Sequence, residues 1–277
     1  RGKDKRMSFV LQHIRDNLWS GRLDIFPADR LVHGFSARLG GVSPAPFDSL
    51  NMALHVGDDL ACVWENRRRY FSALGLHAER LCTIRQIHGT KIVRAMRRDA
   101  GRGARAYEDA LADADAVITN DSGVPLMLCY ADCVPVLLYD PVHHAAGVVH
   151  AGWKGTVQRI AAQTVARMRE EFGTAASDVI AGIGPSIGVG CYTVGPEVAE
   201  QFRAAFPAHA ETIVQDREGA LHLDLWAANH VQLAEAGVLE KNIDHADICT
   251  SCECKFFYSY RSADGRTGRL AAVMELR

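Results

Sequence analysis

The chain has 277 residues, a formal net charge of -2 and 48% hydrophobic residues. This length permits one large domain or two small ones with a sizeable core. The near-neutral charge and the lack of a basic stripe argue against a nucleic-acid partner, and no apolar run approaches the roughly 20 residues that span a bilayer. We therefore expect no nucleic-acid partner and no membrane association.

The start of the chain, RGKDKRM, is basic and is followed by no apolar signal segment. We expect residues 1–7 to be a disordered tail or a remnant of the expression vector. No repeat or linker interrupts residues 8–277, which predicts a single domain. Eight cysteines without regular spacing are typical of reduced thiols in a cytoplasmic protein. A monomer is our default expectation.

The first predicted elements are a strand over residues 31–35, an irregular Gly/Pro-rich loop and a helix that begins at Asp58 or Asp59 and reaches residue 74. The loop holds Arg38. An Arg in such a loop is usually solvated, although its planar donor fork also suits an anion. The arginines at positions 67–69 are interpreted as a solvated face of the helix.

Two strands over residues 81–87 and 91–96 are predicted to meet at a tight turn that contains His88. A turn His is more often exposed than a ligand. Asp113 and Asp115 precede a strand that reaches residue 119. They form either a carboxylate pair or an ordinary turn.

The most informative stretch runs from residue 129 to residue 156. Two apolar runs, 134–139 and 145–149, predict neighbouring buried strands because both are rich in Val and Leu and a turn signal separates them. Asp132 and Cys133 precede the first run, and His150 follows the second. Rigid strands therefore position reactive side chains at their ends.

A turn of small residues, AGWKG, separates His150 from a helix predicted over residues 156–172. A strand, a small-residue turn and a helix together favour anion binding. Lys154 could assist. Farther along, the pattern predicts a strand over 179–183, a Gly-rich loop that lines a site, two helices over 196–206 and 224–236, and C-terminal strands split by a turn at Asp264.

Two chemistries compete for Cys133 and His150. One is a thiolate nucleophile with His as its base. The other is a zinc site with two His, one Cys and an open fourth position, in which His88 could be the third ligand. Spacing alone leaves this choice open. Cys249, Cys252 and Cys254 resemble half of a zinc knuckle, but no second pair follows, so we interpret them as a chance cluster.

Many separate motifs carry a resemblance to one family. They are FSARLGGVSPAPFDSLN, RQIHGTKIV, ADADAVITN, YADCVPVLLYDP, VVHAGWKGT, GIGPSIGVGCY and CTSCECKFFYSYRSADGRTGR. Together they resemble the multicopper polyphenol oxidase (laccase) domain family, whose members are also called purine nucleoside phosphorylases of the peptidoglycan editing factor type. The resemblance implies a single α/β (mixed α+β) catalytic domain of mixed β-sheets flanked by helices, similar to the toxin-like cysteine hydrolase fold.

The resemblance also assigns site residues. It implies a zinc site of His88, Cys133 and His150, and it places Arg38 at the position of the family's loop Arg. Lys154 stands where many relatives carry Arg. Ser186 and Thr193 stand where a Cys and a Glu are common.

The implied function is zinc-dependent phosphorolysis of purine nucleosides to a free base and a sugar 1-phosphate, with adenosine deamination as a second activity. For phosphate we expect Arg38, Lys154 and the backbone from Gly152 to Gly155. Asp132 is a candidate for proton transfer or for orienting a ligand.

The rival reactions are a metal-free Cys-His hydrolase or amidase that acts on a peptidoglycan precursor, and copper-dependent oxidation. A non-enzymatic rival is a scaffold that binds nucleotides or partners around a structural zinc. Copper is disfavoured, because an oxidase with a trinuclear cluster needs many His ligands and the sequence has no H-x-H motif.

Overall fold

The computed structural model describes residues 9–277, so the predicted tail over residues 1–7 lies outside the described residues. Most strands belong to two sheets, with strand orders β1-β2-β3-β13-β6 and β12-β9-β7-β8-β5-β4. The first sheet consists of β1 (Phe9–Arg15), β2 (Leu18–Leu23), β3 (Leu31–Ser36), β13 (Leu270–Leu276) and β6 (Leu126–Tyr130). The second consists of β12 (Ile243–His245), β9 (Ile180–Ile183), β7 (Val134–Asp140), β8 (Ala145–Ala151), β5 (Ala116–Thr119) and β4 (Ile92–Arg94).

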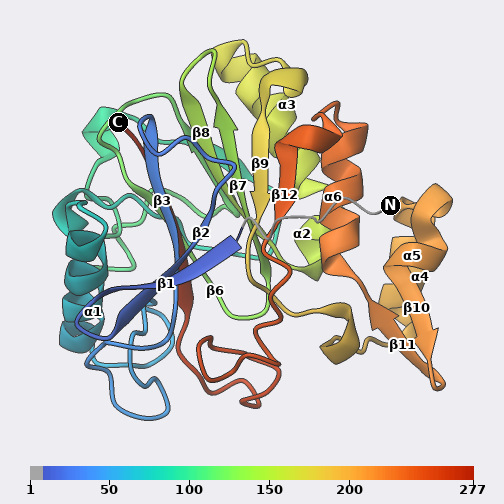
Figure 1. The fold of residues 1–277 in the computed structure, drawn as a ribbon, viewed down its shortest axis with the longest axis horizontal. Helices are drawn as coiled ribbons and strands as arrows, with labels where there is room; N and C mark the ends of the chain where they lie inside the picture. Colours follow the sequence, from blue (N-terminus) through green and yellow to red (C-terminus); the bar gives the residue numbers. More distant parts are fainter. Residues whose placement is uncertain (1–8) are drawn as a thin grey trace.

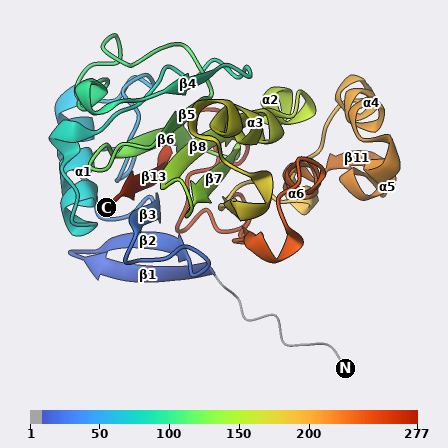
Figure 2. The same ribbon diagram turned by 90° about the horizontal axis from the view of Figure 1, so that it is seen from above.

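Helices cover the outer faces of the two sheets, and a small hairpin lies at one end (Figure 1). The helices are α1 (Leu60–Ala73), α2 (Trp153–Val157), α3 (Ile160–Phe172), α4 (Pro196–Ala205), α5 (Ala210–Ile213) and α6 (Leu225–Glu235). The hairpin pairs β10 (Val214–Arg217) with β11 (Ala220–Leu223). Figure 2 shows α1 on one side of the sheets and α3 and α6 on the other.

The core between the two sheets explains the apolar runs of the central strands. Leu137 of β7 packs toward the first sheet in one cluster with Leu128, whereas Val136 and Leu138 pack toward the helices in another. The sequence of a strand that is buried on both faces is a continuous run of hydrophobic residues. The predicted fold class, a mixed α+β domain with flanking helices, is confirmed.

The hairpin of β7 and β8 fixes the place of the reactive residues. The two strands are antiparallel, with Pro135 opposite His150 and Val134 opposite Ala151. Cys133 immediately precedes β7. The prediction of neighbouring buried strands is confirmed, and the antiparallel register brings Cys133 and His150 to the same end of the pair.

Several predicted elements differ from the structure. Residues 81–87 form no strand and make only isolated bridges, such as Cys82 with Leu126. The predicted helix over 156–172 is two helices, because Arg159 adopts a left-handed conformation with φ 64° between α2 and α3. Asp59, by contrast, is the N-cap of α1 as predicted, and its side chain accepts a hydrogen bond from the Ala61 N–H.

The interpretation of Arg67 as a solvated residue was wrong. Its side chain is 2% exposed, and its guanidinium donates to the carbonyl oxygens of Met52, Gly103 and Ala104. A buried Arg is tolerated here because backbone carbonyls satisfy its donors. Arg68 does lie on the exposed face.

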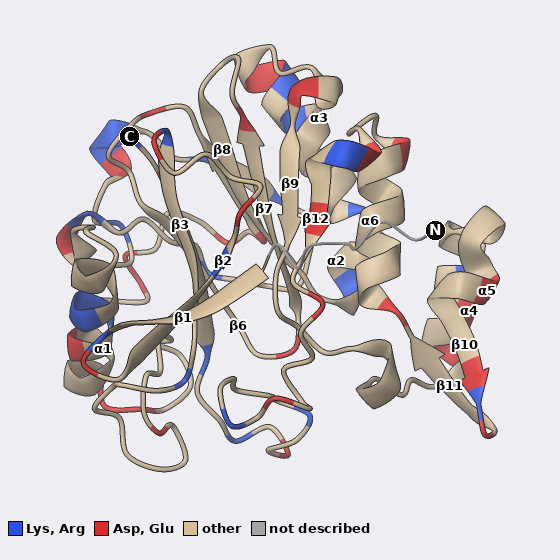
Figure 3. Ribbon diagram, in the orientation of Figure 1, with Lys and Arg blue, Asp and Glu red and all other residues tan. Residues whose placement is uncertain are grey.

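Charged residues are mixed in sign along the helices. Figure 3 shows both basic and acidic residues on α1 and α3. Within residues 9–277, no helix is long and apolar enough to cross a membrane.

Candidate metal centre and active site

Three side chains from separate segments converge on one point. Cys133 comes from the β6–β7 connection, His150 from β8 and His88 from the turn before β4. Their potential ligand atoms all lie within 4.8 Å of one another. The imidazoles of His88 and His150 are nearly perpendicular, with centroids 4.9 Å apart. The structure thus brings together the three residues that the resemblance assigned to one metal site.

Asp115 contacts both His88 and His150. From the sequence it was interpreted either as one of a pair of carboxylates or as an ordinary turn residue. Its buried carboxylate accepts a hydrogen bond from Nδ1 of His150 at 2.9 Å. The same carboxylate accepts from the backbone N–H groups of His88 at 2.9 Å and Gly89 at 2.6 Å. A carboxylate on Nδ1 leaves Nε2 of His150 available as a ligand. Asp113 instead pairs with Arg85.

Gln86 anchors the turn that carries His88. Its side-chain amide donates to the Cys129 carbonyl at 2.7 Å and its side-chain oxygen accepts from the Cys129 N–H at 2.8 Å. This pair of bonds attaches the turn to β6. It gives a physical reason for a Gln two residues before His88, a role that the sequence analysis did not predict.

The charges of the three groups stabilise one another. Burial alone would raise the pKa of the Cys133 thiol, but the charges and hydrogen bonds of His150 and His88 outweigh it and lower the pKa to about 6. Burial alone would lower the pKa of His150, whereas Cys133 and Asp115 raise it to about 9. A thiolate is therefore favoured at this point.

The donor set fits a metal ion. Two imidazoles and one thiolate are ligands that suit zinc, and three protein ligands with one open position are typical of a catalytic rather than a structural zinc site. The burial of the three residues is graded, because His150 is buried, Cys133 is half-buried and His88 is exposed. The fourth position can therefore face solvent or a substrate.

A cavity of about 590 Å³ opens over the three residues. Its wall includes aromatic side chains from four segments: His55, Trp153, Tyr192 and Tyr260. Flat aromatic walls suit a flat heterocyclic ligand. Tyr192 belongs to the Gly-rich loop over residues 184–195, which was predicted to line a site and does so.

Two arginines contribute positive charge to the cavity wall. Arg261 donates to the Thr193 side chain and carbonyl, each at 3.1 Å, and its guanidinium lies 5.1 Å from the centroid of the Tyr192 ring. Arg269 donates from Nη1 to the carbonyls of Thr267 and Gly268. Neither was predicted from the sequence, which indicated strands in this C-terminal segment; between β12 and β13 the chain instead forms turns and irregular structure.

Asp132 also lines the cavity, but hydrogen bonds from other residues occupy its carboxylate. Its carboxylate accepts hydrogen bonds from Thr250 at 2.7 Å, Ser259 at 3.0 Å and the Arg261 N–H at 2.7 Å. The residue has φ 81°. These bonds fix the segment around Arg261 to the connection that carries Cys133.

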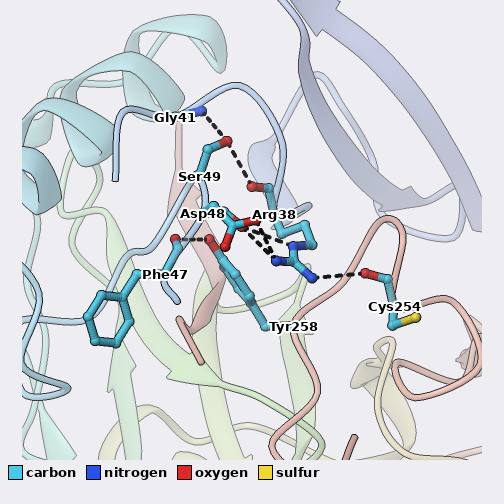
Figure 4. A network of polar contacts seen from close by, with 7 residues as sticks. All are labelled: Arg38, Gly41, Phe47, Asp48, Ser49, Cys254 and Tyr258. Atoms are coloured by element: carbon cyan, nitrogen blue, oxygen red, sulfur yellow. Dashed lines mark hydrogen bonds and ion pairs between the residues drawn. The ribbon is translucent and has the colours of Figure 1, made fainter. Parts of the chain in front are cut away.

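Arg38 does not line this cavity. Its guanidinium donates to the carbonyl and carboxylate of Asp48 and to the Cys254 carbonyl, and it lies 4.9 Å from the centroid of the Tyr258 ring. Figure 4 shows these contacts closing the loop around Arg38. The structure does not bring Arg38 together with the three ligands through any direct contact.

Gly152 and Gly155 lie close to the three ligands, whereas Lys154 is exposed. A Cβ atom on Gly152 would lie 3.1 Å from the Cys133 sulfur, and one on Gly155 would lie 3.1 Å from the Gly89 carbonyl. The small residues of this turn therefore permit close packing beside the site. The ammonium of Lys154 lies 5.7 Å from the centroid of the Trp153 ring, at the rim.

Comparison with known proteins adds an independent line of evidence. Residues 32–277 match the family described as multi-copper polyphenol oxidoreductase laccase. The chain belongs to this family. Purine nucleoside phosphorylase YlmD of Bacillus subtilis is 39% identical over 248 residues, which are 89% of each chain. Adenosine deaminase RL5 of an unknown prokaryotic organism is 34% identical over 250 residues, or 90% of this chain and 95% of the relative.

The fold of the family is also shared. The crystal structure of YlmD from Geobacillus stearothermophilus has a TM-score of 0.92 and 37% identity, covering 97% of this chain and 99% of that one. The family expected from the sequence motifs is confirmed, as is its fold.

Proposed function

We propose that the protein is a zinc-dependent purine nucleoside phosphorylase. It would convert adenosine, inosine, guanosine or methylthioadenosine and phosphate into a base and a sugar 1-phosphate, with adenosine deamination as a side activity. The observation that carries the proposal is an open His-Cys-His site beneath an aromatic cavity that also holds arginines. The names of the relatives, a phosphorylase and a deaminase, support it.

Each group of residues in the cavity would have a separate role in the reaction. The aromatic walls would stack on the purine, and Arg261 and Arg269 would bind phosphate and balance its charge. Asp115 would hold His150 in the tautomer that leaves Nε2 free. A zinc ion held by His88, Cys133 and His150 would supply Lewis-acid chemistry and lower the pKa of a water molecule.

The roles given to other residues on family resemblance stay predictions. Phosphate binding by Arg38 would require an anion to displace the Asp48 carboxylate from its guanidinium. Lys154 at the rim and the backbone from Gly152 to Gly155 stay candidate phosphate ligands. The three hydrogen bonds to Asp132 favour the orienting role over proton transfer. The monomeric state and the cytoplasmic location also stay predictions.

Product analysis tests the proposed function. Zinc-loaded protein is incubated with adenosine, with and without phosphate, and the products are identified by mass spectrometry. We expect adenine and ribose 1-phosphate only when phosphate is present, inosine in smaller amounts, and none of these three products from Cys133→Ala. Phosphorolysis that persists in zinc-free Cys133→Ala would contradict the zinc-dependent part. If no purine nucleoside reacts, the proposed function is wrong.

A metal-free thiol hydrolase is the second candidate, and one arrangement favours it. Cys133, His150 and Asp115 stand in the order of a nucleophile, a base and an orienting carboxylate. In that reaction His88 would be neither the base nor the orienting carboxylate, and it would only add to the lowering of the Cys133 pKa by His150. Substitution of His88 by Ala therefore separates the two candidates, because it should abolish zinc-dependent phosphorolysis but leave an amidase active. The copper oxidase in the family description is disfavoured, since the chain lacks H-x-H pairs.

A further inference from the structure

A second group of sulfurs lies apart from the His-Cys-His site. Cys191, Cys249 and Cys252 have their sulfur atoms within 4.8 Å of one another, and we call them the thiol cluster. The sulfurs of Cys191 and Cys252 are 3.4 Å apart although the residues are 61 positions apart in sequence. The interpretation of Cys249 and Cys252 as a chance cluster did not anticipate Cys191, which the fold brings to them.

We propose that the thiol cluster binds one thiophilic metal ion, with Zn²⁺ as the natural probe, through the three sulfurs of Cys191, Cys249 and Cys252. Thiolates bound to zinc at about 2.3 Å in a tetrahedral arrangement lie roughly 3.8 Å apart, and the cluster is already near this spacing. Cys249 and Cys252 also have the C-x2-C spacing of zinc ligands. Since Cys252 is exposed, solvent can occupy the fourth position.

Local packing prepares one of the sulfurs as a ligand. The backbone N–H of Gly188 donates to the Cys249 sulfur at 3.2 Å. An N–H donor favours the charged form of a thiol and so favours metal binding. Gly188 allows this approach because a Cβ there would lie 3.2 Å from the Cys249 Cβ and 3.5 Å from its sulfur.

A disulfide is the competing use of these thiols. It would join only two of the three sulfurs, and those of Cys191 and Cys252 would have to approach from 3.4 Å to about 2.05 Å. One metal ion would use all three sulfurs close to where they stand. The convergence of three rather than two sulfurs therefore favours the metal.

The position of the thiol cluster gives the ion a structural role. Cys191 lies on the Gly-rich loop that carries Tyr192, and Cys252 lies on the C-terminal turns that carry Tyr260 and Arg261. Both segments line the cavity. A metal ion bound by the thiol cluster would link the Gly-rich loop to the C-terminal turns at the rim of the cavity. The proposal does not depend on which reaction the cavity supports.

Metal counting tests the proposal on the full chain. Protein stripped with a chelator under reducing conditions is refilled with Zn²⁺ and measured by native mass spectrometry. We expect two bound ions for the unmodified chain and for Cys254→Ser, whose thiol lies outside the cluster on the same segment. Cys191→Ser and Cys252→Ser should each retain one ion, as should Cys133→Ala. A single ion in the unmodified chain that disappears in Cys133→Ala would overturn the proposal.

A second measurement requires no variant and so does not depend on whether a variant folds. The rate of alkylation of each thiol is followed by peptide mass spectrometry with and without Zn²⁺. We expect Zn²⁺ to slow alkylation of Cys191 and Cys252 by at least tenfold and to leave Cys254 unchanged. Equal rates at Cys191 and Cys252 in both conditions, or a disulfide between them in zinc-loaded protein, would show that the cluster is not a metal site.

Discussion

At the scale of single residues, the candidate site depends on a buried carboxylate that does not line the cavity. Asp115 accepts hydrogen bonds from the imidazole of His150 and from the backbone of the turn that carries His88. One buried side chain therefore orients two of the three predicted ligands. Such supporting groups tune metal affinity although they do not touch the metal.

Replacing Asp115 by Asn keeps the shape of the side chain but removes its charge. We expect zinc affinity to fall by about 10–100-fold, because the amide can no longer hold His150 in one tautomer as an ionised acceptor. Competition with a chelator in the Cys252→Ser background measures this affinity without the thiol cluster. Asp113→Asn is the matched control and should change nothing, since Asp113 is exposed and pairs with Arg85. Equal affinity in both variants would refute the role of Asp115.

Thr193 offers a test of the proposed phosphate site. It contacts the guanidinium of Arg261 through its side chain and its carbonyl. In Thr193→Glu a carboxylate would neutralise Arg261, so the KM for phosphate should rise about fivefold, which is roughly 1 kcal/mol. The uncharged Thr193→Gln variant should keep the KM. Steady-state kinetics at varied phosphate concentration measure the KM of each variant. A similar rise of the KM in both variants would indicate a steric rather than an electrostatic effect.

At the scale of elements, α1 is tied to two loops by a side chain that the helical pattern alone assigned to the solvent. Arg67 reaches the loop before α1 through Met52 and the polar loop after β4 through Gly103 and Ala104. The helix therefore organises irregular segments that have no regular structure of their own. Backbone carbonyls in buried loops must find donors, and Arg67 supplies them.

The loss of the Arg67 donors should lower the free energy of unfolding. Replacing Arg67 by Met removes the guanidinium donors from three buried carbonyl groups, of which that of Met52 still accepts from the Cys129 thiol at 3.6 Å. We expect the free energy of unfolding to fall by roughly 3 kcal/mol. The neighbouring Arg68→Met should change it by at most about 0.5 kcal/mol, because Arg68 is exposed. Urea unfolding of the three proteins measures both values. A loss below about 1 kcal/mol in Arg67→Met would mean that water satisfies the loop carbonyls.

At the scale of the whole molecule, a histidine that becomes partly buried when the first sheet forms makes global stability sensitive to pH. His33 of β3 accepts a hydrogen bond from the Leu23 N–H of β2 at 3.0 Å. Burial, reinforced by the charge of Arg22, lowers the pKa of His33 from 6.5 to about 4. The folded protein therefore prefers neutral His33, whereas the unfolded chain binds a proton near pH 6.5.

This difference sets the direction of the pH effect. The contribution of His33 to stability is complete above pH 6.5 and is lost as the pH falls through the window toward 4, by about 2 kcal/mol. Urea unfolding at pH 7, 6, 5 and 4.5 measures the trend. His33→Gln keeps an acceptor but does not titrate, so its stability should fall less over this range. Parallel curves for both proteins would assign the pH dependence to other groups.

The sequence by itself determined the central strands, the capped helix α1 and the family, because hydrophobic runs, caps and dense motifs are local signals. The Asp115 contacts, the burial of Arg67 and the thiol cluster were decided only by the tertiary structure. Each joins residues distant along the chain, such as Cys191 and Cys252. Periodicity records which face of an element is buried, but it carries no information about which distant loop lies against that face. Contacts between irregular segments depend on the closure of the whole fold.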